Sequence, residues 1–211
     1  MENVVMNFKN IKLMCASLLL ICSNASATLM TFETRDLNHD AVNHGINKLD
    51  YAGSWLAQSS DINSVELFDF TMIKSGNDRI SHLQIDLSID RDLANWFFEL
   101  GLDAGFGAAV YLDGNLVANR TDDLWWGYNW NSSDVFTVAL NGLTRENKVV
   151  DIYWGEHCCN GASSIRFKSD VSEWNNLSST NLANASIPEP TSIALIAMGL
   201  LGLVNRKRFS K

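Results

Sequence analysis

Basic residues are scarce in the central part of this 211-residue sequence. Between Thr28 and Ile187 lie 22 of the 24 acidic residues but only 10 of the 16 basic ones, which gives this stretch a formal net charge of −12. Such an acidic body repels nucleic acid and anionic lipid, so nucleic acid is not an expected partner. The acidity is compatible with divalent cations or neutral glycans, and also with a role in solubility alone.

Cysteine is also scarce, with four residues in the chain. Cys15 and Cys22 lie in an N-terminal segment that is expected to be removed, which leaves Cys158 and Cys159 side by side. This excludes a framework of disulfide-closed loops and leaves a vicinal disulfide, two free thiols or bridges to a second chain. An oxidising compartment favours the vicinal disulfide. Adjacent Cα atoms are about 3.8 Å apart, below the usual ~4.4–6.8 Å for a disulfide, so the ring is expected to need a tight turn and to reduce easily.

Motifs of common catalytic sites are missing as well. The sequence has no nucleophile elbow, Walker loop, dinucleotide fingerprint or spaced zinc motif. We therefore expect a protein without enzymatic activity, catalytic residues or a required cofactor. The alternative is a glycan hydrolase that uses two carboxylates, because their separation is a three-dimensional quantity. His39 and His44 lie near Asp36 and Asp40 but lack a zinc-type partner cluster, so solvated loop residues are expected there.

The N-terminal segment contains the three parts of a secretory signal peptide in their usual order: basic, apolar and small residues. Lys9 and Lys12 precede an apolar run from Leu13 to Cys22, and the small residues Ala25-Ser26-Ala27 follow. We expect residues 1–27 to be cleaved after Ala27 on export. Without the two ends, about 160 residues remain, which is enough for a single domain with a real core.

The C-terminal residues 187–211 contain three features in a fixed order. Pro188-Glu189-Pro190 holds the only two prolines of the chain, which favour an extended and accessible segment. An uncharged apolar run from Ile193 to Val204 follows, and the basic cluster Arg206-Lys207-Arg208 is expected to keep this end in the cytoplasm. The tail resembles the PEP-CTERM sorting signal of Gram-negative bacterial surface proteins, with its membrane helix. The resemblance implies an exosortase as partner, transient anchoring in the inner membrane, cleavage near the motif, and a final location at the cell surface or in the extracellular matrix.

A second motif lies around the adjacent cysteines. Cys158-Cys159-Asn160-Gly161 resembles the CCXG group of PEP-CTERM proteins, a class that is defined by this motif rather than by an activity. Asn160 and Gly161 tolerate the backbone angles that a tight turn requires. Glu156 and His157 precede the cysteines, but zinc takes four ligands and a catalytic cysteine needs a base from elsewhere in the fold. A structural turn is therefore the favoured interpretation.

Apolar and polar residues alternate from Val65 onward, which is typical of half-buried antiparallel strands. The alternation is strict from Leu83 to Ile89, and Asp113-Gly114 between two strand-like runs predicts a two-residue hairpin. Strand-like runs recur between turn signals, without a long helix. The sequence therefore predicts an all-β domain over residues 28–174, as an antiparallel β-sandwich or jelly roll. The polar, small residues 175–186 predict a flexible linker.

The hairpin region has a further resemblance. Residues 96–100 and 108–117, with Tyr111-Leu112-Asp113-Gly114, resemble the protective-antigen-type lectin and adhesin sandwich. The resemblance implies a β-sandwich, and some members of that family bind glycans through calcium. The paired-aspartate calcium motif of the adhesin members is not recognisable here. The resemblance therefore implies calcium as a candidate ligand, and no metal-binding residue is assigned.

Four aromatic residues lie within six positions, preceded by two aspartates: Asp122, Asp123, Trp125, Trp126, Tyr128 and Trp130. Aromatic rings stack on the apolar faces of sugars, and nearby polar groups can bond sugar hydroxyls, so this segment is a candidate glycan site. Alternatively, Trp125 and Trp130 plug the end of the sandwich while Trp126 and Tyr128 cover its rim. The sequence thus predicts an exported, non-catalytic module that associates with extracellular polysaccharide.

Overall fold

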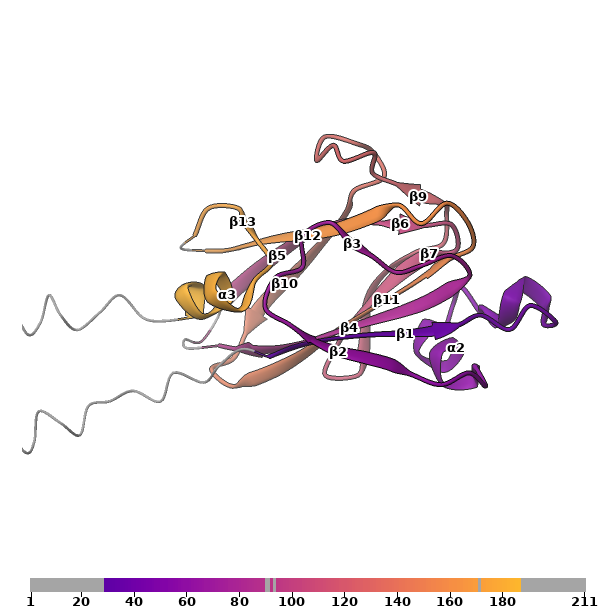
Figure 1. Ribbon diagram of the computed structural model, residues 1–211. Helices are drawn as coiled ribbons and strands as arrows, with labels where there is room; N and C mark the ends of the chain where they lie inside the picture. The colour runs from indigo at the N-terminus through magenta and orange to yellow at the C-terminus, as the bar shows by residue number, and fades with distance from the viewer. Residues whose placement is uncertain (1–28, 90–91, 93, 171, 187–211) are drawn as a thin grey trace, which may run out of the picture.

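The computed structural model describes residues 29–89, 92, 94–170 and 172–186, which form two antiparallel β-sheets packed face to face (Figure 1). The six-stranded sheet has the order β2-β1-β4-β11-β7-β8. Its strands are β1 Met30–Asp36, β2 Asn63–Leu67, β4 Arg79–Ser88, β7 Gly107–Leu112, β8 Asn115–Arg120 and β11 Asn147–Glu156. The predicted antiparallel all-β fold is confirmed.

The second sheet has the order β10-β5-β12-β13, with β3 paired to β12, and β6 and β9 form a separate short ribbon. These strands are β3 Ile73–Lys74, β5 Ala94–Gly101, β6 Asp103–Ala104, β9 Leu124–Trp125, β10 Phe136–Leu143, β12 Ala162–Ser169 and β13 Asn175–Asn176. The helical segments are η1 Val42–Gly45, α2 Tyr51–Ala57 and α3 Ser179–Ser186.

The core lies between the two sheets. Leu83, Ile85 and Leu87 of β4 are fully buried, as their alternation predicts. Apolar side chains of β5 and β12 meet them from the opposite sheet in one continuous cluster. Trp154 of β11 is also fully buried and stacks on Phe32 with ring centroids 5.8 Å apart. Alternation along each strand therefore decides which residues fill the core.

The hairpin between β7 and β8 has the turn that its sequence predicts. Asp113 and Gly114 have φ values of 49° and 76°. A two-residue hairpin turn of this type needs positive φ at both central positions, and Asp-Gly tolerates this better than most pairs. The Asp113 carboxylate also accepts a hydrogen bond from the Val149 amide at 2.9 Å, which ties the turn to β11.

Residues 175–186 are not a flexible linker, so this prediction is wrong. They form β13 and α3, and Leu177 and Leu182 have no exposed surface. The side chain of Ser178 accepts a hydrogen bond from the Asn181 amide at 3.2 Å, as a helix-capping residue does. The two leucines account for the difference, since burying each stabilises the fold by roughly 1.5–3 kcal/mol. The compact body therefore extends to Ser186.

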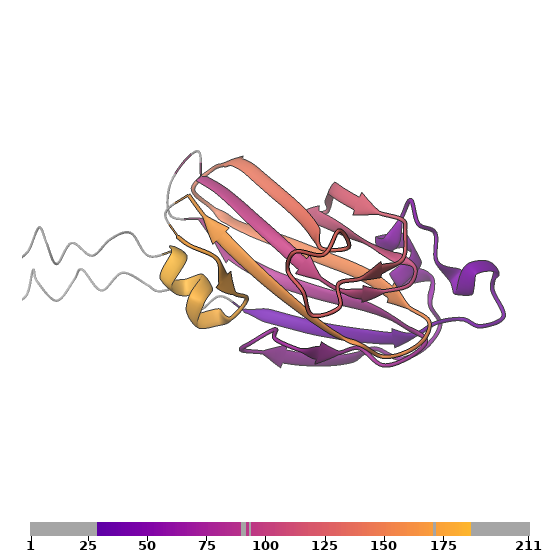
Figure 2. The ribbon, with the colours of Figure 1, turned by 90° about the horizontal axis from the view of Figure 1, so that it is seen from above.

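Both ends of the described body lie at one end of the sandwich (Figure 2). In the register of β1, β4 and β11, Met30 pairs with Ile85, whereas Asp36, Arg79 and Glu156 align at the far end. The expected signal peptide and the expected membrane helix fall outside the described residues. Within the described ranges, no helix is long and apolar enough to cross a membrane.

Candidate functional site

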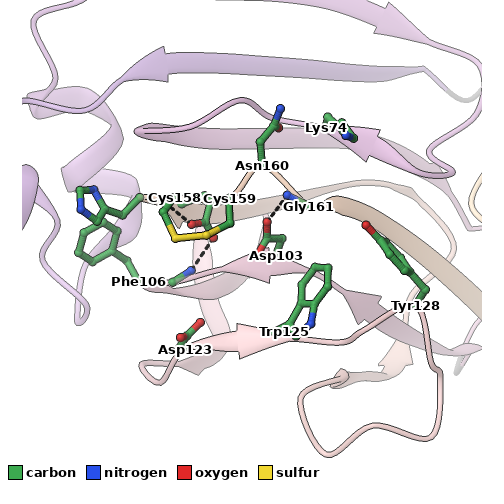
Figure 3. A pocket seen from close by; sticks show the side chains of 13 residues that line it. Lys74, Asp103, Phe106, Asp123, Trp125, Tyr128, Cys158, Cys159, Asn160 and Gly161 are labelled. Atoms are coloured by element: carbon green, nitrogen blue, oxygen red, sulfur yellow. Dashed lines mark hydrogen bonds between the residues drawn. A yellow bond between two sulfur atoms is a disulfide. The ribbon is translucent and has the colours of Figure 1, made fainter.

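A hollow of about 670 Å³ opens at the end of the sandwich that carries Glu156 (Figure 3). It lies between the β6–β9 ribbon and the turn that joins β11 to β12. Three aromatic side chains, three carboxyl groups, Lys74, His157 and residues 158–161 line it. We call this hollow the end cavity.

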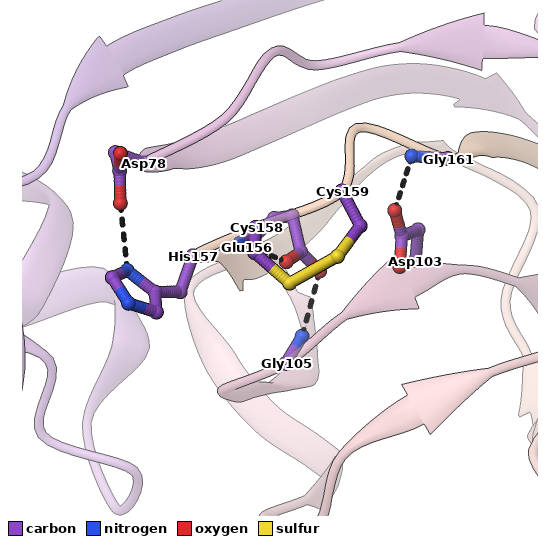
Figure 4. The surroundings of a disulfide bond; sticks show 8 residues. All are labelled: Asp78, Asp103, Gly105, Glu156, His157, Cys158, Cys159 and Gly161. Carbon is purple, nitrogen blue, oxygen red and sulfur yellow. Dashed lines mark hydrogen bonds and ion pairs between the residues drawn. A yellow bond between two sulfur atoms is a disulfide. The ribbon is translucent and has the colours of Figure 1, made fainter.

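The turn at residues 157–161 forms one wall of the end cavity (Figure 4). Cys158 and Cys159 are joined by a disulfide, with their Cα atoms 3.7 Å apart. Cys159 and Asn160 have φ values of 77° and 41°, and the Asn160 side chain accepts a hydrogen bond from the Gly76 amide at 2.8 Å. A Cβ at Gly161 would lie 2.4 Å from the Trp125 ring, so only glycine allows the turn to approach this closely.

We expect mass spectrometry of the exported protein to detect this disulfide as a closed ring within one non-reduced peptide spanning Gly155 to Arg166. The peptide mass should be about two hydrogens lower than that of the dithiol, because each thiol loses one hydrogen when the bond forms. Reduction before digestion supplies the control and should restore both hydrogens. Thiols that alkylate without reduction, or a cross-linked dimer, would contradict the vicinal ring.

Two buried carboxyl groups lie beneath the disulfide. Glu156 is 4% exposed and accepts hydrogen bonds from the amides of Cys158 and Gly105, at 2.6 and 2.9 Å. Asp103 is 9% exposed, accepts a hydrogen bond from the Gly161 amide, and lies close enough to Glu156 that the two charges interact. Burial raises the pKa of both carboxyl groups, and their mutual repulsion opposes ionisation of both. The pair therefore keeps a proton at a pH where an exposed carboxyl group is ionised.

Trp125 and Tyr128 form the aromatic wall of the end cavity. Their side chains are 44% and 50% exposed, and their ring centroids lie 5.3 Å apart at an angle of 76°. Both rings and the disulfide border the same hollow (Figure 3). Gly127 and Tyr128 both have positive φ, and this turn directs the Tyr128 ring to the same side as Trp125. The cavity therefore offers two aromatic surfaces to a ligand.

The other two rings of the predicted aromatic segment lie elsewhere. Trp126 is 3% exposed, and its Nε1 donates a hydrogen bond to the Ala162 carbonyl at 2.9 Å. Trp130 packs on Arg166, whose guanidinium carbon lies 4.5 Å from the ring centroid. Trp126 is thus a buried packing residue at the end of the sandwich. Neither Trp126 nor Trp130 lines the cavity. The predicted arrangement with Trp125 as a core plug and Trp126 at the rim is wrong, because Trp125 is exposed and Trp126 is buried. The four rings do not all border the cavity, because successive turns send neighbouring rings in different directions, and glycan binding by this segment stays a prediction.

The two predicted aspartates also separate. Asp123 lines the end cavity, whereas Asp122 does not and forms an ion pair with Arg120. The hydrogen bond from Arg120 lowers the pKa of Asp122. Sequence reasoning missed Asp103, because nothing in its surroundings distinguishes it from other aspartates. The sequence places Glu156 beside the cysteines, but the interpretation that it favours there is a structural turn.

A histidine and a phenylalanine complete the rim. His157 bonds to Asp78 through Nδ1 at 2.6 Å, and its ring centroid lies 6.1 Å from that of Phe106. The His44 ring packs against His157, with centroids 4.5 Å apart. Among the residues that the structure describes, no three His, Cys, Asp or Glu side chains are grouped so that they could hold a metal ion.

Comparison with family models identifies the C-terminal tail. Residues 186–208 match the PEP-CTERM protein-sorting motif, which confirms the prediction for Pro188-Glu189-Pro190 and the basic cluster that ends at Arg208. This motif indicates export and sorting to the cell surface, and it implies processing by an exosortase. No curated protein matches the chain.

Three solved structures illustrate what this chain is similar to. The PA14 sugar-binding domain of an RTX adhesin is 12% identical, with a TM-score of 0.47 over 74% of this chain and 97% of that domain. The PA14 domain of the MpAFP antifreeze protein is 12% identical, with a TM-score of 0.46 over 72% and 89%. A subtype-switched epithelial adhesin A domain from Candida glabrata, in complex with β-lactose, is 8% identical, with a TM-score of 0.46 over 72% and 87%. Two of these three structures are PA14 domains and the third is an adhesin domain, but similarity at this level does not identify a ligand.

Proposed function

We propose that this protein is a non-catalytic glycan-binding module that associates with extracellular polysaccharide through the end cavity. The observation that carries the proposal is the exposed pair of rings, Trp125 and Tyr128, set beside carboxyl and amide groups in one hollow. Aromatic rings present an apolar face, and Tyr128 adds a hydroxyl group that can exchange hydrogen bonds. A sugar needs this combination, because it has apolar ring faces and polar edges.

The size of the cavity is compatible with this role. A volume of about 670 Å³ falls within the range of roughly 300–1,000 Å³ that is usual for small-molecule sites. The carboxyl groups of Asp123 and Asp103 and the side-chain amide of Asn160 border it, and all of these can accept hydrogen bonds from hydroxyl groups. A few sugar rings of a longer polymer are therefore the proposed occupant.

The position of the cavity fits display on a surface. Helix α3, which ends at Ser186, lies at the opposite end of the sandwich from the end of β11 that carries Glu156 (Figure 1). We propose delivery by an exosortase in a Gram-negative bacterium, with transient anchoring in the inner membrane. A folded body that is held at the membrane by its C-terminal end would then present the cavity on the side away from the membrane.

A glycan hydrolase is the alternative, and the geometry of the carboxyl groups disfavours it. Glycosidases separate their two carboxyl groups by about 5–5.5 Å or by about 6.5–9.5 Å, to leave room for the sugar or a water molecule. Asp103 and Glu156 are instead buried, and both accept hydrogen bonds from backbone amides, those of Gly161, Cys158 and Gly105. These contacts are those of groups that hold the turn in place rather than of groups free to act on a sugar.

The test of the proposal is glycan retention by a variant with both exposed rings removed. Replacing Trp125 and Tyr128 with alanine is expected to weaken binding on a glycan array about tenfold to a hundredfold, since aromatic contacts contribute about 0.5–1.5 kcal/mol each. The free energy of unfolding should change little, because both side chains are half exposed. Calcium or a chelator is expected to leave retention unchanged, since the proposed contacts need no cofactor.

The matched control is Phe68→Ala, which removes an exposed aromatic ring that does not line the cavity. It is expected to bind glycans as the unmodified protein does. The proposal is contradicted by an array that retains no glycan with the unmodified protein, or by equal retention with the double variant.

A further inference from the structure

We propose that the end cavity selects glycans that carry free, protonated amino groups, such as polymers of glucosamine, over their N-acetylated counterparts. This inference rests on the proposed glycan-binding function and adds the class of sugar. Its basis is a group of carboxyl groups in an aromatic-walled cavity, Asp103, Asp123 and Glu156, which form no ion pair with any described Lys, Arg or His side chain, although Lys74 and His157 line the same cavity.

The buried carboxyl groups lack a positive partner. Charged groups inside proteins are normally paired with an opposite charge, since an unpaired buried charge is costly. In the parts of the chain that the structure describes, Asp103 and Glu156 form no ion pair with any Lys, Arg or His side chain. Lys74 lines the same cavity without pairing with either, and the partner of His157 is Asp78. A cationic ligand would supply the missing charge.

A third carboxyl group adds to the negative potential. Asp123 lines the cavity and is close enough to Asp103 that its charge helps to raise the Asp103 pKa. The rings of Trp125 and Tyr128 lie at the same cavity, and aromatic faces attract cations through their quadrupole. Carboxylates and ring faces therefore favour the same ligand group, an ammonium ion on a sugar.

The hydrogen-bonding capacity of the pair also fits an ammonium group. An ionised carboxylate has about four acceptor sites, and an ammonium group has three donors. Two backbone amides use part of the capacity of Glu156, and one amide uses part of that of Asp103. Acetylation of the sugar amine removes the charge and two of the donors, so the N-acetylated sugar cannot replace these contacts.

Binding of an amine should release a proton. In the free protein, burial raises the pKa of both Asp103 and Glu156, so the pair favours a state that holds a proton. An ammonium ion beside the pair favours the ionised form of both groups, so this proton leaves to solvent as the amine binds. The affinity for the amino sugar should therefore rise with pH above the ordinary carboxyl range of about 4–4.5, as long as the free pair still holds its proton and the sugar amine stays protonated.

The experiment is calorimetric titration of the exported protein with two probes, oligomers of glucosamine and oligomers of N-acetylglucosamine of equal length. The glucosamine oligomer is expected to bind at least about tenfold more tightly at low salt. The difference should shrink as salt increases, because screening weakens charge interactions. Titration in buffers of different ionisation enthalpy should detect proton release with the glucosamine oligomer alone.

Two single substitutions separate the cavity from the general acidity of the protein. Asp123→Asn is expected to weaken binding of the glucosamine oligomer about two- to fivefold, the scale of a partly exposed charge interaction. Its exposed position should leave the fold intact, whereas Glu156→Gln removes an acceptor of two backbone amides and is a harsher change. The matched control is Asp122→Asn, because it removes the same charge one residue away and outside the cavity. It should bind both probes as the unmodified protein does.

The possible failures are distinguishable. Equal affinity for the two probes, or a preference for the N-acetylated one, overturns this inference and leaves the glycan-binding function standing. A preference that Asp122→Asn reduces as much as Asp123→Asn also overturns it, because the effect would then come from net charge. Absence of binding by any glycan, here and on the array, overturns the proposed function itself.

Discussion

Replacing Trp126 with alanine is expected to lower the free energy of unfolding by about 3–5 kcal/mol, the usual cost of removing a large buried aromatic side chain. The ring packs closely against Gly101, where an added Cβ would be only 2.4 Å from the nearest ring atoms. The substitution also removes the donor that bonds the Ala162 carbonyl. Denaturant unfolding, followed by circular dichroism, measures the loss.

The control for this effect is Trp125→Ala, which removes the same side chain one residue earlier. Trp125 is 44% exposed, so its loss should change the free energy of unfolding by less than about 1 kcal/mol. Equal losses for the two variants would contradict the assignment of Trp126 to the core and Trp125 to the cavity. The pair therefore tests directly how the aromatic segment divides between packing and binding.

Deleting Arg206 to Arg208, or replacing Glu189 with alanine, is expected to leave the exported protein unprocessed in the inner membrane. The basic cluster should hold the C-terminal end in the cytoplasm, and the motif at Glu189 should present the site that an exosortase recognises. Cell fractionation with immunoblotting measures the result, since unprocessed protein is larger and sediments with the membrane.

Thr191→Ala provides the control, because it changes a residue next to the motif without altering Pro188-Glu189-Pro190. This variant should be processed as the unmodified protein is. Normal processing of both the Glu189 variant and the deletion would show that the tail is not read as a sorting signal. The body of the protein should fold in every case, because the described core ends at Ser186.

Local patterns in the sequence predicted most of the fold. Alternating residues predicted the inward face of β4, and the Asp113-Gly114 pair predicted the hairpin between β7 and β8. These signals work because strand faces and tight turns depend on residues that are adjacent or two positions apart. The same local reasoning failed at residues 175–186, where Leu177 and Leu182 are buried by partners far away in the sequence.

By itself, the sequence determined the C-terminal sorting signal, the all-β class and the adjacency of Cys158 and Cys159. Each of these depends on short, contiguous patterns of residues. Only the tertiary structure decided which aromatic rings face the end cavity and which carboxyl group lies beside Glu156. Asp103 reaches Glu156 because the β6–β9 ribbon packs against the end of β11, across many intervening residues. The proposed binding chemistry depends on burial and on charges brought together by folding, and neither property is encoded at a single position.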